Sequence, residues 1–217
     1  IGRKMKILHT LHWIQFAGTE KVCVDLCNEM THSHQVYLLS HDKILPYLND
    51  SVELIEFDFK KNRHNPIFLF QVAQLLKKIA PDVIHCHNTK EIEVMRYAQF
   101  FLAKKIPIVA TKHTLQYKKK YGLADVCVAI LEDTQQILKQ ESILIKNGMA
   151  YVPPVTIQRP EKFYIVLTGR LDQMKGFDIA IEALSLVNFD FECHIFGEGE
   201  ERERLEQLIQ KLNLQHI

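Results

Sequence analysis

The sequence has little glycine and proline, and it has no long apolar run. Its 217 residues include 8 Gly and 7 Pro, while 47% are hydrophobic and 24% charged. This composition excludes a disordered chain, a collagen-like repeat and a low-complexity linker. No apolar run approaches the roughly 18 residues of a membrane-spanning helix; the one at Pro66–Phe70 ends at Gln71.

The five cysteines are odd in number and contain no Cys-x-x-Cys pair, which argues against a disulfide framework or a zinc ribbon. The first residues lack the apolar stretch and small-residue cleavage site of a secretory leader. Both absences predict a reduced, cytoplasmic protein. Cys23 and Cys27 lie beside an apolar helical stripe and are predicted core residues.

Charge is nearly balanced, with 27 Lys and Arg against 26 Asp and Glu. This balance excludes the strongly basic character of a nucleic-acid-binding domain, so we expect no nucleic-acid partner. Basic clusters such as Lys60-Lys61, Lys77-Lys78 and Lys118-Lys119-Lys120 fall in the first 150 residues. We interpret them as solvated surface; peripheral contact with anionic headgroups at the inner face of a membrane is the alternative.

Short apolar or β-branched runs alternate with amphipathic helical patterns along the chain. Helical spacing is clear at Leu69–Ile79, Phe177–Leu184 and Leu205–Leu212. The alternation predicts an α/β fold of right-handed βαβ units with doubly wound parallel sheets. The predicted strands are Lys6–Thr10, Gln35–Leu39, Val52–Phe57, Val83–His87, Ile108–Thr111, Val126–Ile130, Phe163–Thr168 and Phe191–Phe196.

A proline-rich stretch at 152–160 interrupts this pattern, and a fresh strand follows it. We therefore predict two Rossmann-like lobes, over residues 1–154 and 155–217. The second lobe contains two predicted strands, which would leave a sheet edge and apolar helix faces uncovered. We expect this lobe to be incomplete and the chain to be a fragment.

The sharpest motif is 169–176, Gly-Arg-Leu-Asp-Gln-Met-Lys-Gly, between a buried strand and a helix. Helix N-termini favour anions, and Arg170 and Lys175 can add charge-assisted hydrogen bonds to phosphate oxygens. Solvated loop charges, or pairing with Asp172 or Asp178, are the alternative interpretation.

Two motifs lie at the carboxyl ends of predicted strands in the first lobe, where doubly wound folds bind phosphates. After the first strand, Gly18 permits close approach of a ligand, and Thr19 or Glu20 begins a helix. G-x-G-x-x-G and the Walker lysine are absent, so neither a nicotinamide site nor a P-loop is predicted. His113, after another strand, is either a group that hydrogen-bonds a reacting hydroxyl or sugar, or a satisfied loop histidine.

Two further motifs have less certain roles. His85 and His87 alternate onto one strand face, which is compatible with metal binding. No third or fourth ligand is apparent, so we predict core and rim histidines and no metal site. Gly197-Glu198-Gly199 joins a strand to a helix, where it either suits the helix dipole or lines the same cleft as Arg170.

Taken in order, these elements resemble the retaining glycosyltransferases of GT-B architecture, family 4 or group 1. One departure is Ala17, which stands where the family has the first glycine of a Gly-Gly pair. The matching segments are Phe16-Ala17-Gly18-Thr19-Glu20-Lys21-Val22, Asp82-Val83-Ile84-His85-Cys86-His87, Thr111-Lys112-His113, Asn147-Gly148-Met149, Gly169-Arg170-Leu171 through Lys175-Gly176-Phe177, and Ile195-Phe196-Gly197-Glu198-Gly199.

The resemblance implies transfer of a sugar, with retention, from a UDP-, GDP- or ADP-linked donor on the second lobe to a glycan or lipid-linked acceptor on the first. Residues matching Arg170 and Lys175 would bind the donor diphosphate, together with Gly18 and Thr19. The catalytic residue would be His113, near the transferred sugar. No metal or other cofactor is implied, and the usual setting is cell-envelope polysaccharide or lipopolysaccharide synthesis. The cleft would be lined by Gly169, Gly197, Glu198 and Gly199.

The same resemblance places the family's glutamate pair and its base- and ribose-contacting loops beyond Ile217. We therefore expect residues 1–217 alone to be inactive. Two alternatives remain open: a non-catalytic nucleotide-sugar-binding or transferase-like subunit, and a nucleotide-sugar epimerase, whose related fold matches the motif order less well.

Overall fold

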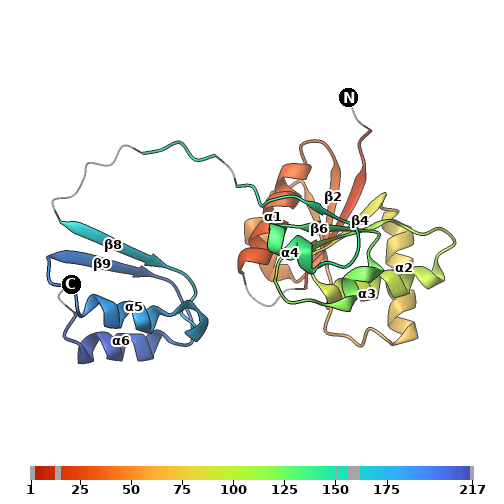
Figure 1. Cartoon of the computed structure of the whole chain (residues 1–217). Coiled ribbons are helices and arrows are strands. Elements are labelled where there is room, and N and C mark those ends of the chain that lie inside the picture. Colours follow the sequence, from red (N-terminus) through yellow and green to blue (C-terminus); the bar gives the residue numbers. More distant parts are fainter. Residues whose placement is uncertain (1–2, 13–15, 150, 156–161, 216–217) are drawn as a thin grey trace. The chain divides into compact units, whose positions relative to one another are not determined.

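The chain folds into two compact units, unit 1 over Ile1–Tyr151 and unit 2 over Val152–Ile217 (Figure 1). The computed structural model describes residues 3–12, 16–149, 151–155 and 162–215. The units divide within the stretch around the prolines, close to the boundary expected after residue 154.

Unit 1 is built on a seven-stranded sheet in the order β3-β2-β1-β4-β5-β6-β7, in which every neighbouring pair is parallel. Parallel neighbours require crossover connections, which the helices of the unit provide. The order is that of a doubly wound Rossmann-like sheet. The strands are β1 (Lys6–Thr10), β2 (Gln35–Ser40), β3 (Val52–Glu56), β4 (Val83–Cys86), β5 (Ile108–Lys112), β6 (Val126–Ala129) and β7 (Ser142–Leu144).

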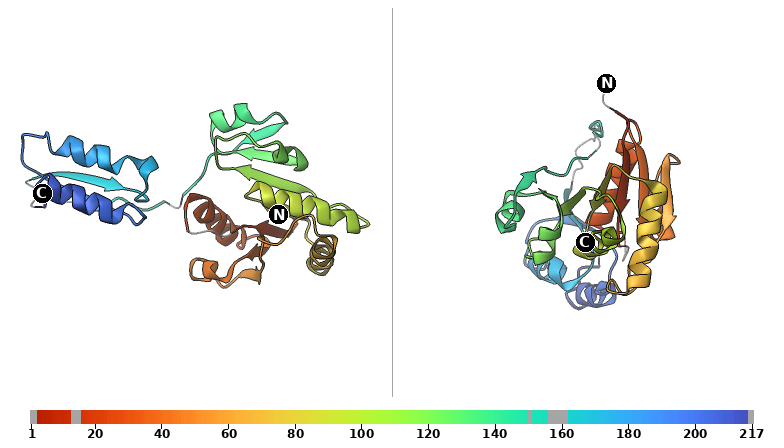
Figure 2. Two further views of the ribbon diagram at one scale, coloured as in Figure 1. Left: turned by 90° about the horizontal axis from the view of Figure 1, so that it is seen from below. Right: turned by 90° about the vertical axis from the view of Figure 1, so that its right-hand side faces the viewer.

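Helices cover both faces of this sheet, with α1 on one side and α2 and α3 on the other (Figures 1 and 2). The start of α2 shows why the sequence folds this way locally: the Asn65 side chain accepts hydrogen bonds from the Ile67 and Phe68 amides, and Pro66 fills the first turn. The helices of unit 1 are α1 (Gly18–Met30), α2 (Pro66–Ile79), α3 (Thr89–Ala98) and α4 (Glu132–Ile137), with short 3₁₀ turns at Asp42–Tyr47, Gln99–Phe101 and Lys119–Leu123.

Two apolar clusters hold the layers together, and alternation along β1 separates them. Leu8 points into the larger cluster with α2 and α3, whereas Cys23 and Cys27 of α1 belong to the smaller one. The prediction that both cysteines are core residues is confirmed, since neither is accessible to solvent. Burial of each large apolar side chain contributes about 1.5–3 kcal/mol.

Unit 2 is a parallel pair of strands, β8 (Phe163–Thr168) and β9 (Phe191–Phe196), with α5 (Phe177–Leu184) and α6 (Arg202–Lys211) together on one face (Figure 1). A short 3₁₀ turn at Gln173–Lys175 precedes α5. Leu171, Phe177, Ile181 and Leu205 form the buried centre. On the opposite face Tyr164, Val166 and Phe196 are exposed.

The predicted strands are all present, with ends shifted by a residue at most. Two differences matter. β4 ends at Cys86, so His87 lies in the loop before α3, and the three-residue β7 was not predicted. None of the described helices is both long and apolar enough to pass through a bilayer.

Candidate functional site

His113 lies directly after β5, at the edge of the unit 1 sheet where the parallel strands end. Its ring is half-buried, and its Nε2 is 3.2 Å from Nδ1 of His87. Burial lowers the pKa of His113 to about 4. Near neutral pH the imidazole is therefore uncharged, so it can exchange hydrogen bonds with a hydroxyl but supplies no positive charge.

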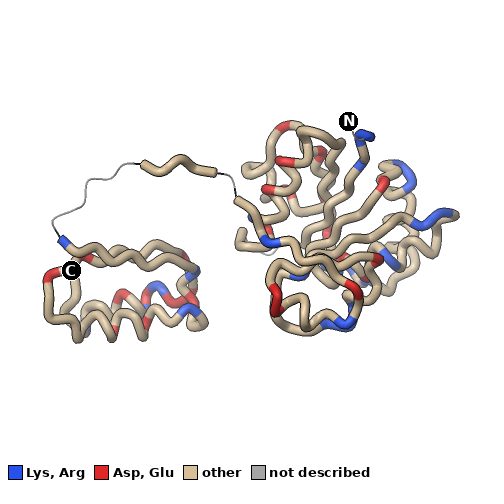
Figure 3. Tube along the Cα trace, turned by 45° about the horizontal axis from the view of Figure 1, so that its top comes forward, with Lys and Arg blue, Asp and Glu red and all other residues tan. Residues whose placement is uncertain are grey.

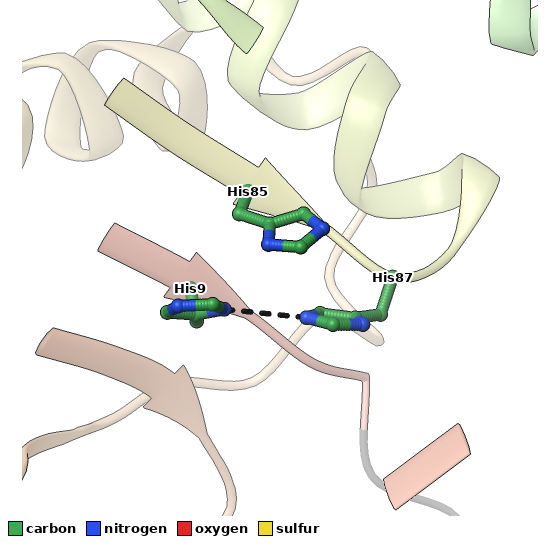
Figure 4. Close-up of side chains that lie close together, drawn as sticks. All are labelled: His9, His85 and His87. Atoms are coloured by element: carbon green, nitrogen blue, oxygen red, sulfur yellow. Dashed lines mark hydrogen bonds between the residues drawn. The ribbon is translucent and has the colours of Figure 1, made fainter. Parts of the chain in front are cut away.

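His87 belongs to a buried group with His9 and His85 (Figure 4). β1 pairs with β4 so that His9 and His85 are register partners, which puts both side chains on one face. The sequence pointed to His85 and His87 but missed His9, because a strand pairing across 76 residues leaves no local signal. Burial lowers the pKa of all three, that of His85 to about 4.

Glu91 is a buried carboxylate that ties the ends of β1 and β4 to α3. It accepts hydrogen bonds from the Thr10 hydroxyl (3.1 Å), the His12 amide (2.6 Å), the His87 amide (2.8 Å), and both the amide (3.1 Å) and side chain (3.0 Å) of Asn88. Burial raises the pKa of Glu91 to about 7, although the hydrogen bonds from Asn88, His12 and His87 act to lower it. The Asn88-x-x-Glu91 spacing of a capping box was the available sequence signal.

Gly18 and Thr19 form the first turn of α1. Gly18 is exposed, and no described atom would lie within 4 Å of a Cβ placed there. Local packing therefore does not demand a glycine, and open space remains beside the helix N-terminus. The Glu20 carboxylate accepts the Ala17 amide hydrogen at 3.2 Å, which closes the start of the helix.

A polar pocket of about 430 Å³ lies beside the ends of β2 and β3. No sequence motif marks this pocket, because its residues come from the loop after β1, from the segment after β2 and from the end of β3 with the residues that follow it. Its wall includes carboxylates, cations and aromatic rings. The lining residues are His12, His41, Lys43, Glu56, Phe57, Asp58, Phe59 and Lys60.

In unit 2, Arg170 and Lys175 are both exposed on the segment between β8 and α5. Arg170 Nε donates to the Asp172 carboxylate, the pairing that the sequence left open. The two terminal guanidinium nitrogens have no hydrogen-bond partner among the described residues. These donors can bind an anion without breaking the contact with Asp172.

The loop that follows β9 is joined to this segment by backbone contacts. The Gly169 and Leu171 amides donate to the carbonyls of Phe196 (3.0 Å) and Glu198 (2.9 Å). A Cβ at Gly197 would lie 1.9 Å from the Gly169 carbonyl oxygen, so only glycine fits there.

Gly199 is required for a similar reason, since a Cβ there would lie 2.2 Å from the Leu171 carbonyl oxygen. The Glu198 carboxylate accepts from Arg202 at 2.6 Å. The two glycines thus have a packing role, and their role in lining a donor cleft, like that of Gly169 and Glu198, stays a prediction.

Residues of both charge signs follow one another closely along the chain at the start of α6 (Figure 3). Arg202 pairs with Glu198 and Glu206, and Arg204 pairs with Glu201 and Asp178. These ion pairs are exposed and individually contribute little to stability. In unit 1 the basic clusters fall on separate loops and helix ends.

The doubly wound parallel sheet, followed by a second β-α-β-α unit with a glycine-bounded cationic loop, defines the class: the fold of the GT-B glycosyltransferases. Solved structures of this class resemble the chain closely in fold. The lipopolysaccharide outer core galactosyltransferase WaaB superposes with a TM-score of 0.70 at 17% identity, over 98% of this chain and 66% of its own. HepE from Anabaena, solved in complex with UDP-glucose, superposes with a TM-score of 0.75 at 18% identity, over 97% of this chain and 67% of its own. A glycosyltransferase from Rickettsia africae superposes with a TM-score of 0.76 at 18% identity, over 99% of this chain and 67% of its own.

Residues 16–144 match the model of Glycosyltransferase Family 4, and residues 154–217 match that of Glycosyl transferases group 1. The chain belongs to glycosyltransferase family 4, which confirms the resemblance seen in the sequence. A glycosyltransferase of Methanocaldococcus jannaschii, itself uncharacterized, is 22% identical over 68% of this chain and 47% of its own length. The chain thus spans about half the length of this curated relative and about two thirds of the solved structures.

Proposed function

We propose that the chain serves the transfer of a sugar from a nucleotide-sugar donor to an acceptor hydroxyl, with retention of configuration. The observation that carries this proposal is the cationic loop of unit 2. In the described part of the chain the terminal nitrogens of Arg170 have no partner, and Lys175 is exposed on the same segment, which backbone hydrogen bonds tie to the residues after β9. A guanidinium and an ammonium on a rigid loop suit the two phosphates of a nucleoside diphosphate.

Unit 2 is the proposed donor side, and its ligand is a UDP-, GDP- or ADP-sugar. The complex of HepE with UDP-glucose supports a UDP-sugar as the first choice. Gly18 and Thr19 of unit 1 are the proposed additional phosphate contacts, because a helix N-terminus with open space beside it favours an anion.

Unit 1 is the proposed acceptor side, and its polar pocket fits a glycan or a lipid-linked glycan. The Glu56 and Asp58 carboxylates can accept hydrogen bonds from sugar hydroxyls, while the partly exposed Phe57 offers aromatic surface. The likeness to WaaB supports a role in cell-envelope polysaccharide or lipopolysaccharide synthesis. Work at the cytoplasmic face of the membrane, with peripheral contact through the basic clusters, would follow from such an acceptor.

In the proposed reaction the bond between the sugar and the diphosphate breaks, and negative charge develops on the departing diphosphate. Arg170 and Lys175 stabilise that charge, which lowers the barrier. The acceptor hydroxyl attacks on the face that the diphosphate leaves, and its proton passes to an oxygen of the departing diphosphate. His113 is neutral near pH 7 and would hydrogen-bond the transferred sugar.

Donor binding by the chain itself tests the proposal. We would titrate UDP-, GDP- and ADP-sugars by calorimetry against the unsubstituted chain, Arg170→Ala and Lys175→Ala. Each lost charge-assisted hydrogen bond costs about 1.5–3 kcal/mol, or roughly 10–100-fold in affinity. Lys211→Ala removes an exposed cation elsewhere in unit 2 and should leave donor affinity unchanged. Equal donor affinity in the Arg170 and Lys175 variants would overturn the assignment.

Turnover is a separate question. We expect residues 1–217 to bind the donor without transferring its sugar, because the resemblance assigns further donor contacts to segments outside this range. Transfer of labelled sugar by this polypeptide at ordinary enzyme rates would contradict that expectation. Donor binding without transfer or hydrolysis in a longer polypeptide would favour the alternative of a non-catalytic binding subunit.

A further inference from the structure

Three histidines converge on one face of the unit 1 sheet, beneath α1. His9 is inaccessible to solvent and His87 is 1% exposed. The ring centroid of His85 lies 4.9 Å from that of His9 and 4.5 Å from that of His87. One nitrogen of each ring lies within 4.8 Å of the other two. The proposed transfer reaction gives His9 and His85 no part.

The nitrogens themselves face one another. His9 Nδ1 and His87 Nε2 are 3.3 Å apart. A nitrogen of His85 faces the gap between them (Figure 4). This nitrogen is Nδ1, because His85 Nε2 is bonded to the Thr111 hydroxyl at 2.7 Å. Two nitrogens bound at ~2.0–2.1 Å to a tetrahedral zinc ion lie about 3.3–3.4 Å from each other. The distance between His9 Nδ1 and His87 Nε2 agrees with this separation.

The outward nitrogens of two rings are already held. His85 Nε2 contacts Thr111 Oγ1, and His87 Nδ1 contacts His113 Nε2 at 3.2 Å. Metal-binding histidines nearly always donate their second ring N–H to such a partner, which directs the lone pair of the other nitrogen inward. The Glu91 carboxylate, which accepts the His87 amide hydrogen at 2.8 Å, adds a counter-charge close by.

Without a cation this arrangement leaves polar atoms unpaired. A neutral imidazole carries a single N–H, so the inner contact between His9 and His87 can share one proton at most. His85 Nδ1 then has no hydrogen-bond partner among the described residues. His9 Nε2 is also buried without a partner in the described part of the chain, but a cation at Nδ1 would not pair it. A cation between the rings would engage three lone pairs at once.

We propose that His9 Nδ1, His85 Nδ1 and His87 Nε2 bind a transition-metal cation of the zinc class. Three imidazoles with no carboxylate select zinc, cobalt, nickel or copper over magnesium and calcium. The cation would join β1 to β4. It would also fix the tautomer of His113, because a metal-bound His87 keeps its proton on Nδ1 and donates it to His113 Nε2.

The competing ligand set also includes His9. Cys23 and Cys27 of α1 offer sulfur atoms within 4.8 Å of a His9 nitrogen. The two ligand sets share His9, so only one of them can hold an ion through a given His9 nitrogen. Thiolate ligation produces an intense charge-transfer absorption with cobalt that imidazole ligation lacks, so the two sets are distinguishable by spectroscopy.

The test uses the tag-free 217-residue chain, stripped with a chelator and titrated with Zn²⁺ by calorimetry and with Co²⁺ by absorption. We expect one ion per chain and tetrahedral cobalt bands without a thiolate charge-transfer band. His87→Gln should weaken binding by more than the roughly 10–100-fold loss that removal of an outer partner causes, and Thr111→Val should weaken it within that range. His32→Gln removes an exposed histidine and should bind as tightly as the unsubstituted chain.

Several results would overturn the proposal. These are the absence of stoichiometric zinc binding, equal affinity in His87→Gln, and a thiolate band that disappears in Cys23→Ser. Because His87→Gln can fail to fold, the unsubstituted chain supplies an independent measurement. Long-range ¹H–¹⁵N spectra should show zinc shifting the three inner histidine nitrogens, and unmoved signals would refute the assignment. Neither measurement requires glycosyl transfer.

Discussion

Replacing Glu91 with alanine should destabilise unit 1 substantially. The carboxylate accepts hydrogen from the amides of His12, His87 and Asn88, and the substitution leaves these donors without their partner. Each unpaired buried donor costs about 1–3 kcal/mol, and loss of the cap of α3 adds about 0.5–2 kcal/mol. Water reaches the partly exposed His12 and Asn88, and removal of a buried charge offsets some of the loss. We therefore expect a net cost of about 2–4 kcal/mol.

For a unit of this size such a loss lowers the melting temperature by roughly 5–15 °C. Far-ultraviolet circular dichroism at pH 7 follows this melting, because most of the described helical residues belong to unit 1. Glu91→Gln keeps the shape of the side chain but turns an amide N–H₂ toward N–H donors. Its melting temperature should therefore lie between those of the unsubstituted chain and Glu91→Ala. Glu29→Ala removes an exposed carboxylate from α1 and should melt with the unsubstituted chain. If Glu91→Ala melts within about 2 °C of that control, Glu91 does not tie the strand ends together.

Three further substitutions test other parts of the fold. Gly197→Ala brings a Cβ to 1.9 Å from a backbone oxygen and should disperse or broaden the amide signals of unit 2, whereas Gly148→Ala, with open space around it, should leave them unchanged. Asn65→Ala removes the cap of α2 and should cost about 1 kcal/mol in chemical unfolding of unit 1; a change below a few tenths would show that the cap is not used. Arg204 holds the pKa of Asp178 below its ordinary value, so this stabilisation is present above the ordinary pKa and lost as pH falls through the folded one. Asp178→Asn should therefore weaken hydrogen-exchange protection of unit 2 at pH 7 but not in acid where Asp178 is protonated; an equal loss at both would contradict this.

Most of the fold could be predicted from the sequence because each long strand has a local signal in its own residues. Val126–Ala129 and Phe163–Thr168 are apolar runs bounded by polar loops, and they form β6 and β8. β7 was missed because Ser142–Leu144 is short, partly exposed and at a sheet edge, where an apolar face is not required.

The parts of the site that escaped prediction depend on strand order. His9 has no sequence neighbour that marks it, and its meeting with His85 follows only from the pairing of β1 with β4. The same pairing brings Thr10 to Glu91. The buried Glu91 carboxylate therefore accepts a hydrogen bond from a hydroxyl that lies 81 positions earlier in the sequence. The sequence indicated a turn at Gly197 and Gly199. Both positions require glycine because the backbone of the segment from Gly169 to Leu171 packs directly against them.

The close contact between the loops after β8 and β9 affects how the proposed donor site can change during evolution. Main-chain amides and carbonyls hold the segment from Gly169 to Leu171, and the buried Leu171 side chain anchors it, so its shape does not depend on the exposed side chains nearby. Substitutions at exposed positions such as Met174 can therefore accumulate and retune recognition without disturbing the scaffold. A ligand that docks on this segment meets a surface already ordered, and little of the binding free energy is spent on immobilising it.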